Sequence, residues 1–440
     1  MTTAEGESHA PPGLLTLPPE IREHVYSLIL RSANNRNQPE DEDEGPFYTY
    51  DFSILRVNRL IHHEASKIFN DNIFVKITTP WTEAIPHVNS EGKVAVVTTG
   101  RPATDFQNFH LRVLIDTPDL AQWRQPPPDS YSMITTLEDL PAFTRIWYFS
   151  NLNNNRQLNP HLQLRLDLKN PYTPDEPVTK SLQTKLLMPF GQVKDLESTQ
   201  FEYCGHSFFP NCPVYPSIRT AVLEEQAKPA PTPEECIEQT LVHKKVGNEL
   251  FAKKAYTEAL QTYFKAFESM HIYISGRKRE IHCDGYYGEE LRSGTHKGQY
   301  AHYVRMTLRV QLVANVVYTY LQLEEWAEAF FWGKRSIRLF RASMEGTDHI
   351  GGNGWDNWVG QSVGMAFAAK KEMGKLFYRT ALAGRRLVPQ SKSDYSWEGT
   401  GREELDALMR AAGAYLPEDQ TVQAEVKALE LRNLVRSSGS

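Results

Sequence analysis

The strongest constraint on the fold of this chain is a pattern of small residues in its second half. Gly247, Ala259 and Ala266 recur at spacings that suit two consecutive helices, and large apolar residues such as Leu250 and Tyr263 stand between them. Small side chains let two helices approach closely, and large ones fill the space that remains. The sequence therefore predicts a tightly packed antiparallel pair of helices at this point.

Two further copies of the pattern follow. The second occupies residues 315–321 and 323–330, and the third begins at residues 375–383 with a delayed second helix at 402–412. Residues 418–431 predict a last amphipathic helix that is suited to cap the array. The three helix pairs resemble the tetratricopeptide repeat (TPR), whose antiparallel helix pairs stack into a solenoid, and three repeats are the usual minimum for a stable array.

The resemblance is closest to TPR domains that hold the C-terminal carboxylates of the heat-shock chaperones. Those domains use a clamp for two carboxylates, with Lys and Asn four residues apart in the first repeat, Asn in the second, and Lys and Arg four residues apart in the third. The matching positions of this sequence carry Lys244, Asn248, Asn315, Lys375 and Arg379. The resemblance implies that these five residues bind an acidic C-terminal peptide of a heat-shock chaperone.

The chemistry of these side chains suits a carboxylate ligand, because residues four apart share one face of a helix. Arg379 can bind a carboxylate through two N–H groups, whereas Lys244 and Lys375 act as point charges. Asn248 and Asn315 can donate amide hydrogens without adding charge. The alternative interpretation is that these lysines and asparagines are merely solvated.

The N-terminal segment predicts two helices and a strand. Residues 17–22 read Leu-Pro-Pro-Glu-Ile-Arg, which favours a helix start, since proline suits the first turn and an acidic residue there complements the helix dipole. One apolar stripe is expected on this helix, at Ile21, Val25, Leu28 and Ile29. The apolar positions expected on the second helix are Ile54, Leu55, Val57, Leu60, Ile61, Ala65 and Ile68. Residues 73–77 follow as a strand.

Two motifs in this segment, L-P-P-E-I-R and R-V-N-R-L-I-H-H-E-A, together resemble the fungal F-box-like module. The first motif supplies the motif residues Leu17, Pro18, Glu20, Ile21 and Arg22. F-box modules dock on the Skp adaptor of cullin ubiquitin ligases, so the resemblance implies a Skp adaptor as a second partner. A purely structural role for the module is the alternative.

Between the predicted F-box-like module and the predicted TPR domain, strands alternate with helices, and this alternation favours an α/β layer. Strands are expected at residues 93–98, 110–115, 161–168 and 197–203, and helices at residues 133–148 and 179–190. Cys204, His206 and Cys212 have an irregular spacing that is typical of loop or core residues rather than of a metal site.

Proline-rich and polar segments mark the expected boundaries between the domains of the chain. We expect a flexible tail at residues 1–12, the F-box-like module at 13–76 and the α/β region at 77–227. A Pro-rich linker at 228–235, in which Thr232 is a good N-cap for the next helix, leads to the TPR domain at 236–436. The predicted fold class is therefore α+β multidomain, with an all-α solenoid of three helix pairs and a capping helix.

Composition narrows the class of protein. The chain has 48 basic and 54 acidic residues, and this net charge of −6 disfavours a nucleic-acid binder. Four cysteines in 440 residues are too few for a disulfide framework. The start of the chain has no apolar region typical of a secretory signal, and no apolar run is long enough to span a membrane. We therefore expect a cytoplasmic protein, with the nucleus as the alternative, and no membrane partner.

The sequence contains no H-E-x-x-H, G-x-S-x-G or P-loop motif, so we expect no enzyme activity, no cofactor and no metal. The sequence favours an adaptor whose repeats capture an acidic C-terminal peptide while the F-box-like half recruits a second partner. One alternative is an F-box substrate receptor of a cullin ubiquitin ligase with the TPRs as substrate-binding scaffold. A chaperone cofactor with an N-terminal scaffold and an enzyme hidden in the α/β region are the others.

Overall fold

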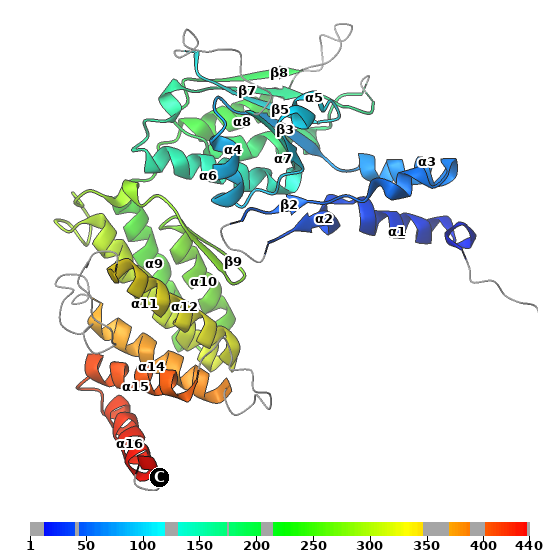
Figure 1. Cartoon of the computed structure of the whole chain (residues 1–440). Coiled ribbons are helices and arrows are strands. Elements are labelled where there is room, and N and C mark those ends of the chain that lie inside the picture. The colour runs from blue at the N-terminus through cyan, green and yellow to red at the C-terminus, as the bar shows by residue number, and fades with distance from the viewer. Residues whose placement is uncertain are drawn as a thin grey trace, which may run out of the picture. The chain divides into compact units, whose positions relative to one another are not determined.

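The computed structural model describes residues 13–39, 44–118, 131–173, 176–203, 214–345, 369–387 and 401–437. The chain is a mixed α+β protein that divides into two compact units, Met1–Ala230 and Pro231–Ser440 (Figure 1). The expected tail at residues 1–12 lies outside the described residues, as do Cys204, His206 and Cys212.

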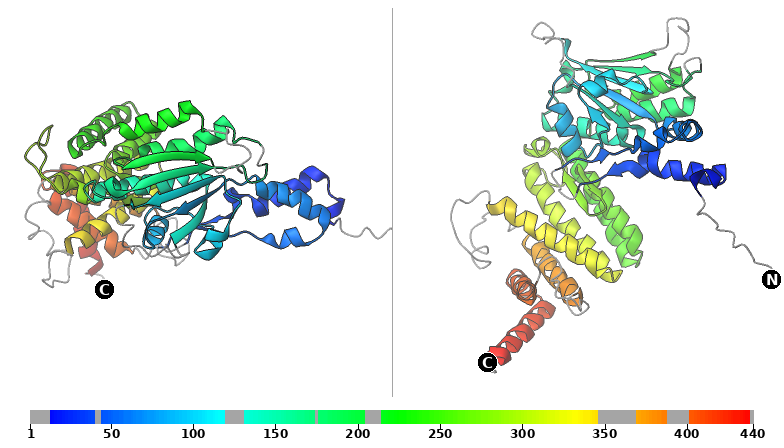
Figure 2. Two further views of the ribbon diagram at one scale, coloured as in Figure 1. Left: turned by 90° about the horizontal axis from the view of Figure 1, so that it is seen from above. Right: turned by 45° about the vertical axis from the view of Figure 1, so that its right-hand side comes forward.

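The N-terminal unit opens with a pair of helices that lie side by side and project from a sheet (Figures 1 and 2). The elements of this part are η1 (Leu14–Thr16), α1 (Pro19–Leu30), α2 (Ser32–Asn35), β1 (Arg36–Asn37), β2 (Phe47–Tyr48), η2 (Phe52–Arg56) and α3 (Arg59–Asn70). The Asn58 side chain caps α3 by accepting a hydrogen bond from the Ile61 backbone N–H, which explains where the second helix begins.

The rest of the unit is a six-stranded mixed sheet with helices against it. Its strands are β3 (Phe74–Thr78), β4 (Thr98–Thr99), β5 (Leu111–Asp116), β6 (Ser132–Thr136), β7 (Gln163–Leu168) and β8 (Ser198–Tyr203), in the order β4-β6-β3-β5-β7-β8. Only the pairs β3–β5 and β7–β8 are parallel. The helices are α4 (Ala84–Ser90), α5 (Arg101–Asp105), α6 (Leu140–Asn153), α7 (Lys180–Leu187), the 3-10 helix η7 (Met188–Gln192) and α8 (Pro216–Ala227).

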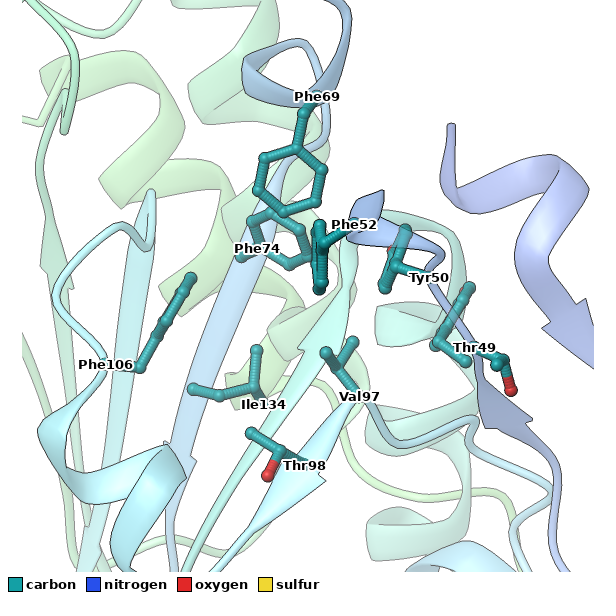
Figure 3. A pocket seen from close by; sticks show the side chains of 10 residues that line it. Thr49, Tyr50, Phe52, Phe69, Phe74, Val97, Thr98, Phe106 and Ile134 are labelled. Carbon is teal, nitrogen blue, oxygen red and sulfur yellow. The ribbon is translucent and has the colours of Figure 1, made fainter. Parts of the chain in front are cut away.

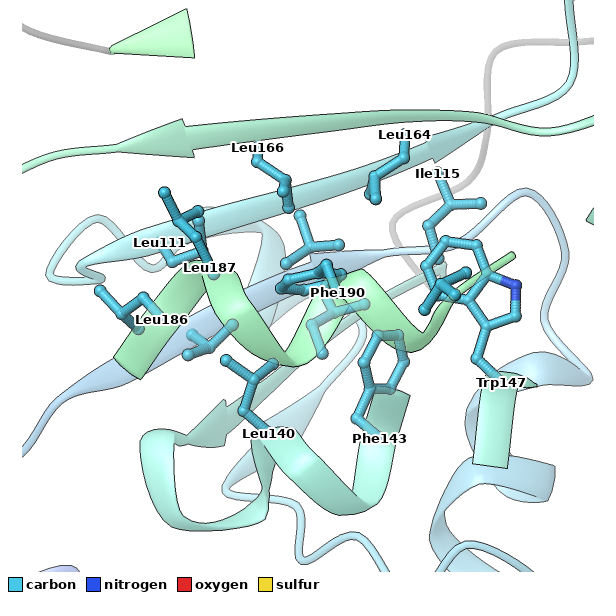
Figure 4. Close-up of a cluster of buried hydrophobic side chains, with 14 of the residues drawn as sticks. Leu111, Ile115, Leu140, Phe143, Trp147, Leu164, Leu166, Leu186, Leu187 and Phe190 are labelled. Atoms are coloured by element: carbon cyan, nitrogen blue, oxygen red, sulfur yellow. The ribbon is translucent and has the colours of Figure 1, made fainter. Parts of the chain in front are cut away.

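One face of the sheet carries the main core of this unit. Side chains alternate along a strand, so Leu164, Leu166 and Leu168 of β7 point to the same face. Figure 4 shows side chains of β5 and β7 meeting those of α6, α7 and η7 across this core, with Phe143 and Phe190 at its centre. Burial of these large apolar side chains fixes the helices against the sheet.

Two expectations for the N-terminal unit are wrong in detail. Residues 133–136, expected to begin a helix, belong to the central strand β6, which pairs with both β3 and β4; the helix α6 starts only at Leu140. The β-branched run at residues 134–136 suits a strand that is buried on both faces. The strand expected at residues 93–98 does not form over most of that range: β4 begins only at its last residue, Thr98, and ends at Thr99.

The apolar stripe expected on α1 is not its buried face. Arg22, Tyr26 and Leu30 are buried instead, while Ile21 and Leu28 are about half exposed, at 49% and 54%. Among the apolar positions expected on the second helix, Leu60 of α3 and Val57, which lies between η2 and α3, are likewise exposed. The reason is that polar atoms of Arg22 and Tyr26 have buried partners on α3, described below, which turn that side of α1 inward.

The C-terminal unit consists of neighbouring helices with one inserted hairpin. Its elements are α9 (Pro233–Ala252), α10 (Tyr256–Glu268), β9 (Ile272–Ser275), β10 (Lys278–Ile281), η8 (Gly285–Tyr287), α11 (Ala301–Gln322), α12 (Trp326–Glu345), α14 (Lys370–Leu387), α15 (Arg402–Tyr415) and α16 (Gln420–Ser437). Helices α9 and α10, α11 and α12, and α14 and α15 pack against each other in pairs. The antiparallel hairpin β9–β10 was not expected, so the unit is not purely helical.

The start of α9 is fixed as its sequence predicts. Thr232 accepts a hydrogen bond from the Glu235 backbone N–H, and the Glu235 side chain accepts one from the Thr232 backbone N–H. This reciprocal capping box satisfies two N–H groups that the first turn of the helix leaves free.

Close helix packing also follows the sequence pattern. Ala259 and Ala266 are fully buried, and a Cβ atom added at Gly247 would lie 2.5 Å from Cε1 of Tyr263. The absence of a side chain at Gly247 therefore allows α9 and α10 to approach closely.

We predict that Gly247→Ala destabilises the C-terminal unit by about 1–3 kcal/mol, because the added methyl group must displace the Tyr263 ring or separate the two helices. Urea unfolding followed by circular dichroism measures the change. Gly401→Ser is the control, since a Cβ atom there meets nothing within 4 Å. Equal stability of Gly247→Ala and the wild type would show that the helices are not in contact at this point.

Candidate functional site

The five residues of the predicted clamp come from the three first helices of the helix pairs, α9, α11 and α14. Helices α9 and α11 contact each other through residue pairs that are all separated by the same number of residues in the sequence. Lys244 bonds to Gln311 and Asn248 bonds to Asn315, each pair 67 residues apart. The ring of Phe251 meets the ring of Tyr318 at the same offset, with centroids 4.9 Å apart. A constant offset means that the two helices run in the same direction, as equivalent helices of a repeat do.

Asn248 is the most connected amide of the cluster. Its Oδ1 atom accepts hydrogen bonds from Nδ2 of Asn315 and from the hydroxyl of Tyr263, both at 2.9 Å. These bonds orient the amide so that its own NH2 group, which donates to none of the described residues, remains for a ligand.

Arg379 of α14 joins the same cluster from the other side. Its guanidinium donates to the carbonyl oxygen of Ala314 and lies 4.2 Å from the ring centre of Tyr318. Burial lowers the pKa of Arg379 to about 10, so that it is still charged at neutral pH. These two contacts hold Arg379 against α11, the helix that carries Asn315.

Lys244 and Lys375 complete the cluster with two ammonium groups. Burial lowers the pKa of Lys244, the carboxylate of Glu372 opposes this, and the positive charge of Lys375 lowers the pKa further. Lys375 lies one turn before Arg379 on α14, so that both side chains are on the same face of this helix. The structure thus brings together all five residues that the sequence analysis selected.

None of the three cations in this cluster forms an ion pair with the part of the chain that the structure describes. Lys244 uses one N–H group for Gln311, and Arg379 uses one for Ala314, so most of their donors are not committed. Three positive charges, of which Lys244 also feels the carboxylate of Glu372, form a group suited to a negatively charged ligand.

The sequence analysis missed the partners of this cluster. Gln311 and Tyr318 lie one turn before and one turn after Asn315, on the same face of α11. Their positions could be found once the register of α9 and α11 is known, but no motif marks them.

Residues of the two motifs that predict an F-box-like module lie at the contact between α1 and α3. Arg22 of α1 donates two hydrogen bonds to the carboxylate of Glu64 on α3, at 2.9 and 2.5 Å, and a third to the Leu17 carbonyl oxygen at 2.7 Å. The hydroxyl of Tyr26 donates to the same carboxylate at 3.0 Å. The arginine of the first motif and the glutamate of the second thus hold the two helices together.

This packing leaves large apolar side chains on the outside of the two-helix module. We call them the N-terminal apolar set, and they are Leu15, Ile21, Leu28, Val57 and Leu60, each about half exposed or more. Among the other motif residues, Leu17 supplies the carbonyl bound by Arg22, Pro18 precedes the first turn of α1 and Glu20 lies in that turn.

An aromatic cavity lies where the two-helix module meets the sheet. It has a volume of about 430 Å³, and Figure 3 shows the rings of Tyr50, Phe52, Phe69, Phe74 and Phe106 around it. Among the described residues that line it, none is charged, so its chemistry suits an apolar or aromatic group rather than catalysis. The sequence analysis missed this cavity, because its aromatic residues come from positions that are far apart in the sequence, 48–52, 69–74 and 106.

The described residues contain no group of three or more His, Cys, Asp or Glu side chains placed to hold a metal ion. The two cysteines described, Cys236 and Cys283, are buried and form no disulfide, and burial raises the pKa of both thiols, which disfavours the reactive thiolate. Of the helices that the structure describes, none combines the length and the apolar character needed to cross a membrane.

Comparison with known protein families finds no family that matches this chain, and no curated protein matches it either.

We predict that the contact between Arg22 and Glu64 makes the N-terminal unit sensitive to acid. The hydrogen bond from Arg22 lowers the pKa of Glu64 below its ordinary value of 4.5. The stabilisation is therefore fully present above pH 4.5 and is lost as the pH falls through the lowered pKa. Glu64→Gln should reduce stability at neutral pH, and its difference from the wild type should shrink in acid.

Unfolding in urea at neutral pH and at a pH below the lowered pKa measures this difference. Asp71→Asn is the matched control, because Asp71 is exposed and lies 3.6 Å from the exposed Arg31. A deficit of Glu64→Gln that is equally large in acid would contradict the assignment.

Proposed function

We propose that this chain is a protein–protein interaction adaptor. Its C-terminal unit binds an acidic C-terminal peptide of the heat-shock chaperone type through a two-carboxylate clamp, and its F-box-like half recruits a second partner. One observation carries the proposal: Lys244, Lys375 and Arg379 gather with two asparagines on α9, α11 and α14, with no ion pair to a described residue. We expect the protein to act in the cytoplasm, with the nucleus as the alternative.

The TPR interpretation of the C-terminal unit is supported by the helix geometry. Short turns of three residues, 253–255 and 323–325, connect the helices of the first two pairs. The constant offset of 67 residues between α9 and α11 is what two consecutive first helices of a repeat array would give, with the hairpin β9–β10 inserted between the pairs.

The donors of the cluster match a peptide terminus that carries two carboxylates. A terminal α-carboxylate can accept from the Asn248 amide and from a lysine, while a neighbouring aspartate side chain can accept from Arg379 and the other lysine. Each such bond contributes about 1.5–3 kcal/mol before the cost of ordering the peptide is subtracted. A net affinity in the micromolar range, about −8 kcal/mol, is therefore expected.

The N-terminal apolar set favours a second candidate function. In it, the chain is an F-box substrate receptor of a cullin ubiquitin ligase, and the TPRs are the substrate-binding scaffold. Large apolar side chains that are half exposed on a two-helix module are typical of a surface that a protein partner covers. In this case the Skp adaptor is the second partner, and both functions can coexist in one adaptor.

We predict that the full-length chain binds the free acid of the pentapeptide M-E-E-V-D in calorimetric titrations with a dissociation constant in the micromolar range. Binding should weaken as salt is added, because the contacts are between charges. The peptide amide should bind at least about tenfold more weakly, since one carboxylate is lost. Lys375→Ala and the double variant Lys375→Ala, Arg379→Ala should show the same loss.

Lys371→Ala is the matched control for this titration, because Lys371 is an exposed lysine on the same helix, α14. Circular dichroism establishes that each variant is folded. Equal affinity of the acid and the amide for the wild type would overturn the clamp and leave the C-terminal unit as a scaffold of another kind.

For the F-box-like half, we predict that the full-length chain co-purifies with a Skp adaptor and that Leu60→Asp abolishes the complex without unfolding the chain. A charge at this exposed position prevents burial in an apolar interface but costs little in the free protein. Size-exclusion chromatography of the mixed proteins detects the complex.

Leu431→Asp, at a leucine of α16 that is 63% exposed, is the control and should still bind the adaptor. Failure of the folded wild type to bind any Skp adaptor would sink this function and leave the N-terminal helices with a structural role.

A further inference from the structure

The aromatic cavity between the two-helix module and the sheet has the size of a small-molecule site. Its volume of about 430 Å³ lies in the range of about 300–1,000 Å³ that is typical of ligand pockets. An apolar cavity of about 150 Å³ is already large enough to hold benzene. The cavity of this protein therefore has room for a ligand of two or three rings.

The side chains that line the cavity are apolar but not fully buried. Phe52 is 41% exposed, and Tyr50, Phe69 and Phe106 are only partly buried. Apolar surface that remains in contact with water gains free energy when it is covered. A ligand that covers these rings completes their burial, and this gain is the driving force for binding.

The arrangement of the rings favours an aromatic ligand over an aliphatic one. Tyr50 stacks on Phe52 with ring centroids 5.7 Å apart, and it lies perpendicular to Phe69 at 5.6 Å. Phe74 and Phe106 meet edge to face at 5.5 Å. Because neighbouring rings are nearly perpendicular, the lining offers both ring faces and ring edges (Figure 3). Aromatic pairs in such arrangements contribute free energy beyond that of the area they bury.

The polar groups of the lining select a neutral ligand. None of the described residues that line the cavity is charged, and burying a charge without a partner is costly. The hydroxyls of Tyr48 and Tyr50 already have hydrogen-bond partners in the protein. Beyond its rings, the lining therefore offers a ligand little more than the hydroxyls of Thr49 and Thr98.

We propose that this cavity is a binding site for a small, neutral aromatic molecule of two or three rings. The ligand contacts Phe52 and Phe69 of the two-helix module on one side, and Phe74 and Thr98 of the sheet on the other. It thereby strengthens the attachment of the module to the sheet. The inference is independent of the peptide-binding function, because the cavity lies wholly in the N-terminal unit, and its lining shares no residue with the N-terminal apolar set.

Calorimetric titration of the full-length chain with 2-naphthol tests the proposal, because this probe is an uncharged two-ring aromatic at neutral pH. We expect saturable binding at one site with a dissociation constant of about 100 µM or lower. The anion 2-naphthoate has the same rings and should bind at least about tenfold more weakly. The saturated analogue 2-decalol has the same carbon skeleton and should bind at least about threefold more weakly.

Thr98→Phe is the decisive variant, because it places an additional ring in the cavity and should abolish the binding of 2-naphthol. Thr99→Phe is the matched control and should bind as the wild type does. Thr99 is the next residue of β4, is exposed and does not line the cavity, since neighbouring side chains of a strand point to opposite faces. Circular dichroism establishes that each variant is folded.

Phe52→Leu is the second variant. It keeps an apolar side chain but removes one ring, so it should weaken the binding of 2-naphthol by about threefold and leave that of 2-decalol unchanged. Absence of saturable binding to the folded wild type would overturn the proposal. Unchanged binding in Thr98→Phe and Phe52→Leu would overturn it too, because the probe would then bind elsewhere. Equal affinity for 2-naphthol and either analogue would contradict the proposed class of ligand.

Discussion

Several glycines of the C-terminal unit stand where a neighbouring helix comes so close that even a methyl group would collide with it. Gly247 faces Tyr263 between α9 and α10, Gly333 faces Thr380 between α12 and α14, and Gly384 of α14 faces Phe330 and Leu405. Interiors packed to this density tolerate little displacement. These contacts fix the spacing and the register of successive helices. The positions of Lys244, Lys375 and Arg379 on α9 and α14, and of the two asparagines on α9 and α11, depend on that spacing.

Much of the helical architecture could be predicted, because the signals are local. The capping box at Thr232, the small residues of α9 and α10, and the helical spacing of the third pair can all be recognised in short stretches of sequence. The positions of the five residues of the predicted clamp on their helices could be predicted in the same way, from their spacing. The contacts that orient them, such as the Ala314 carbonyl under Arg379, depend on how three helices meet and leave no local pattern.

The failures of prediction have one physical cause in common. On α1, the buried contacts of Arg22 and Tyr26 with Glu64 outweigh the tendency of Ile21 and Leu28 to be inside. In β6, pairing with strands on both sides decides the conformation of residues 133–136, which also suit a helix. In each case partners distant in sequence override the local preference.

The two surfaces proposed to bind partners rely on different forces. The three cations Lys244, Lys375 and Arg379 would attract a negatively charged ligand over a distance that becomes shorter as the salt concentration rises. The N-terminal apolar set would act only when a partner is in contact with it. In the proposed adaptor, binding at the three cations would therefore depend on salt concentration, whereas binding at the N-terminal apolar set would depend on it little.

The constant offset between α9 and α11 has a consequence for how such a chain can change over time. The hairpin β9–β10 and the loop after it are inserted in the sequence between two helix pairs. The three contacts that align α9 with α11 nevertheless all join residues that are 67 apart in the sequence. Added residues at this junction therefore leave the alignment of the helices untouched. The junction is a tolerant point of the architecture, where new segments can be acquired, lost or exchanged while the side chains that α9 and α11 bring together keep their places.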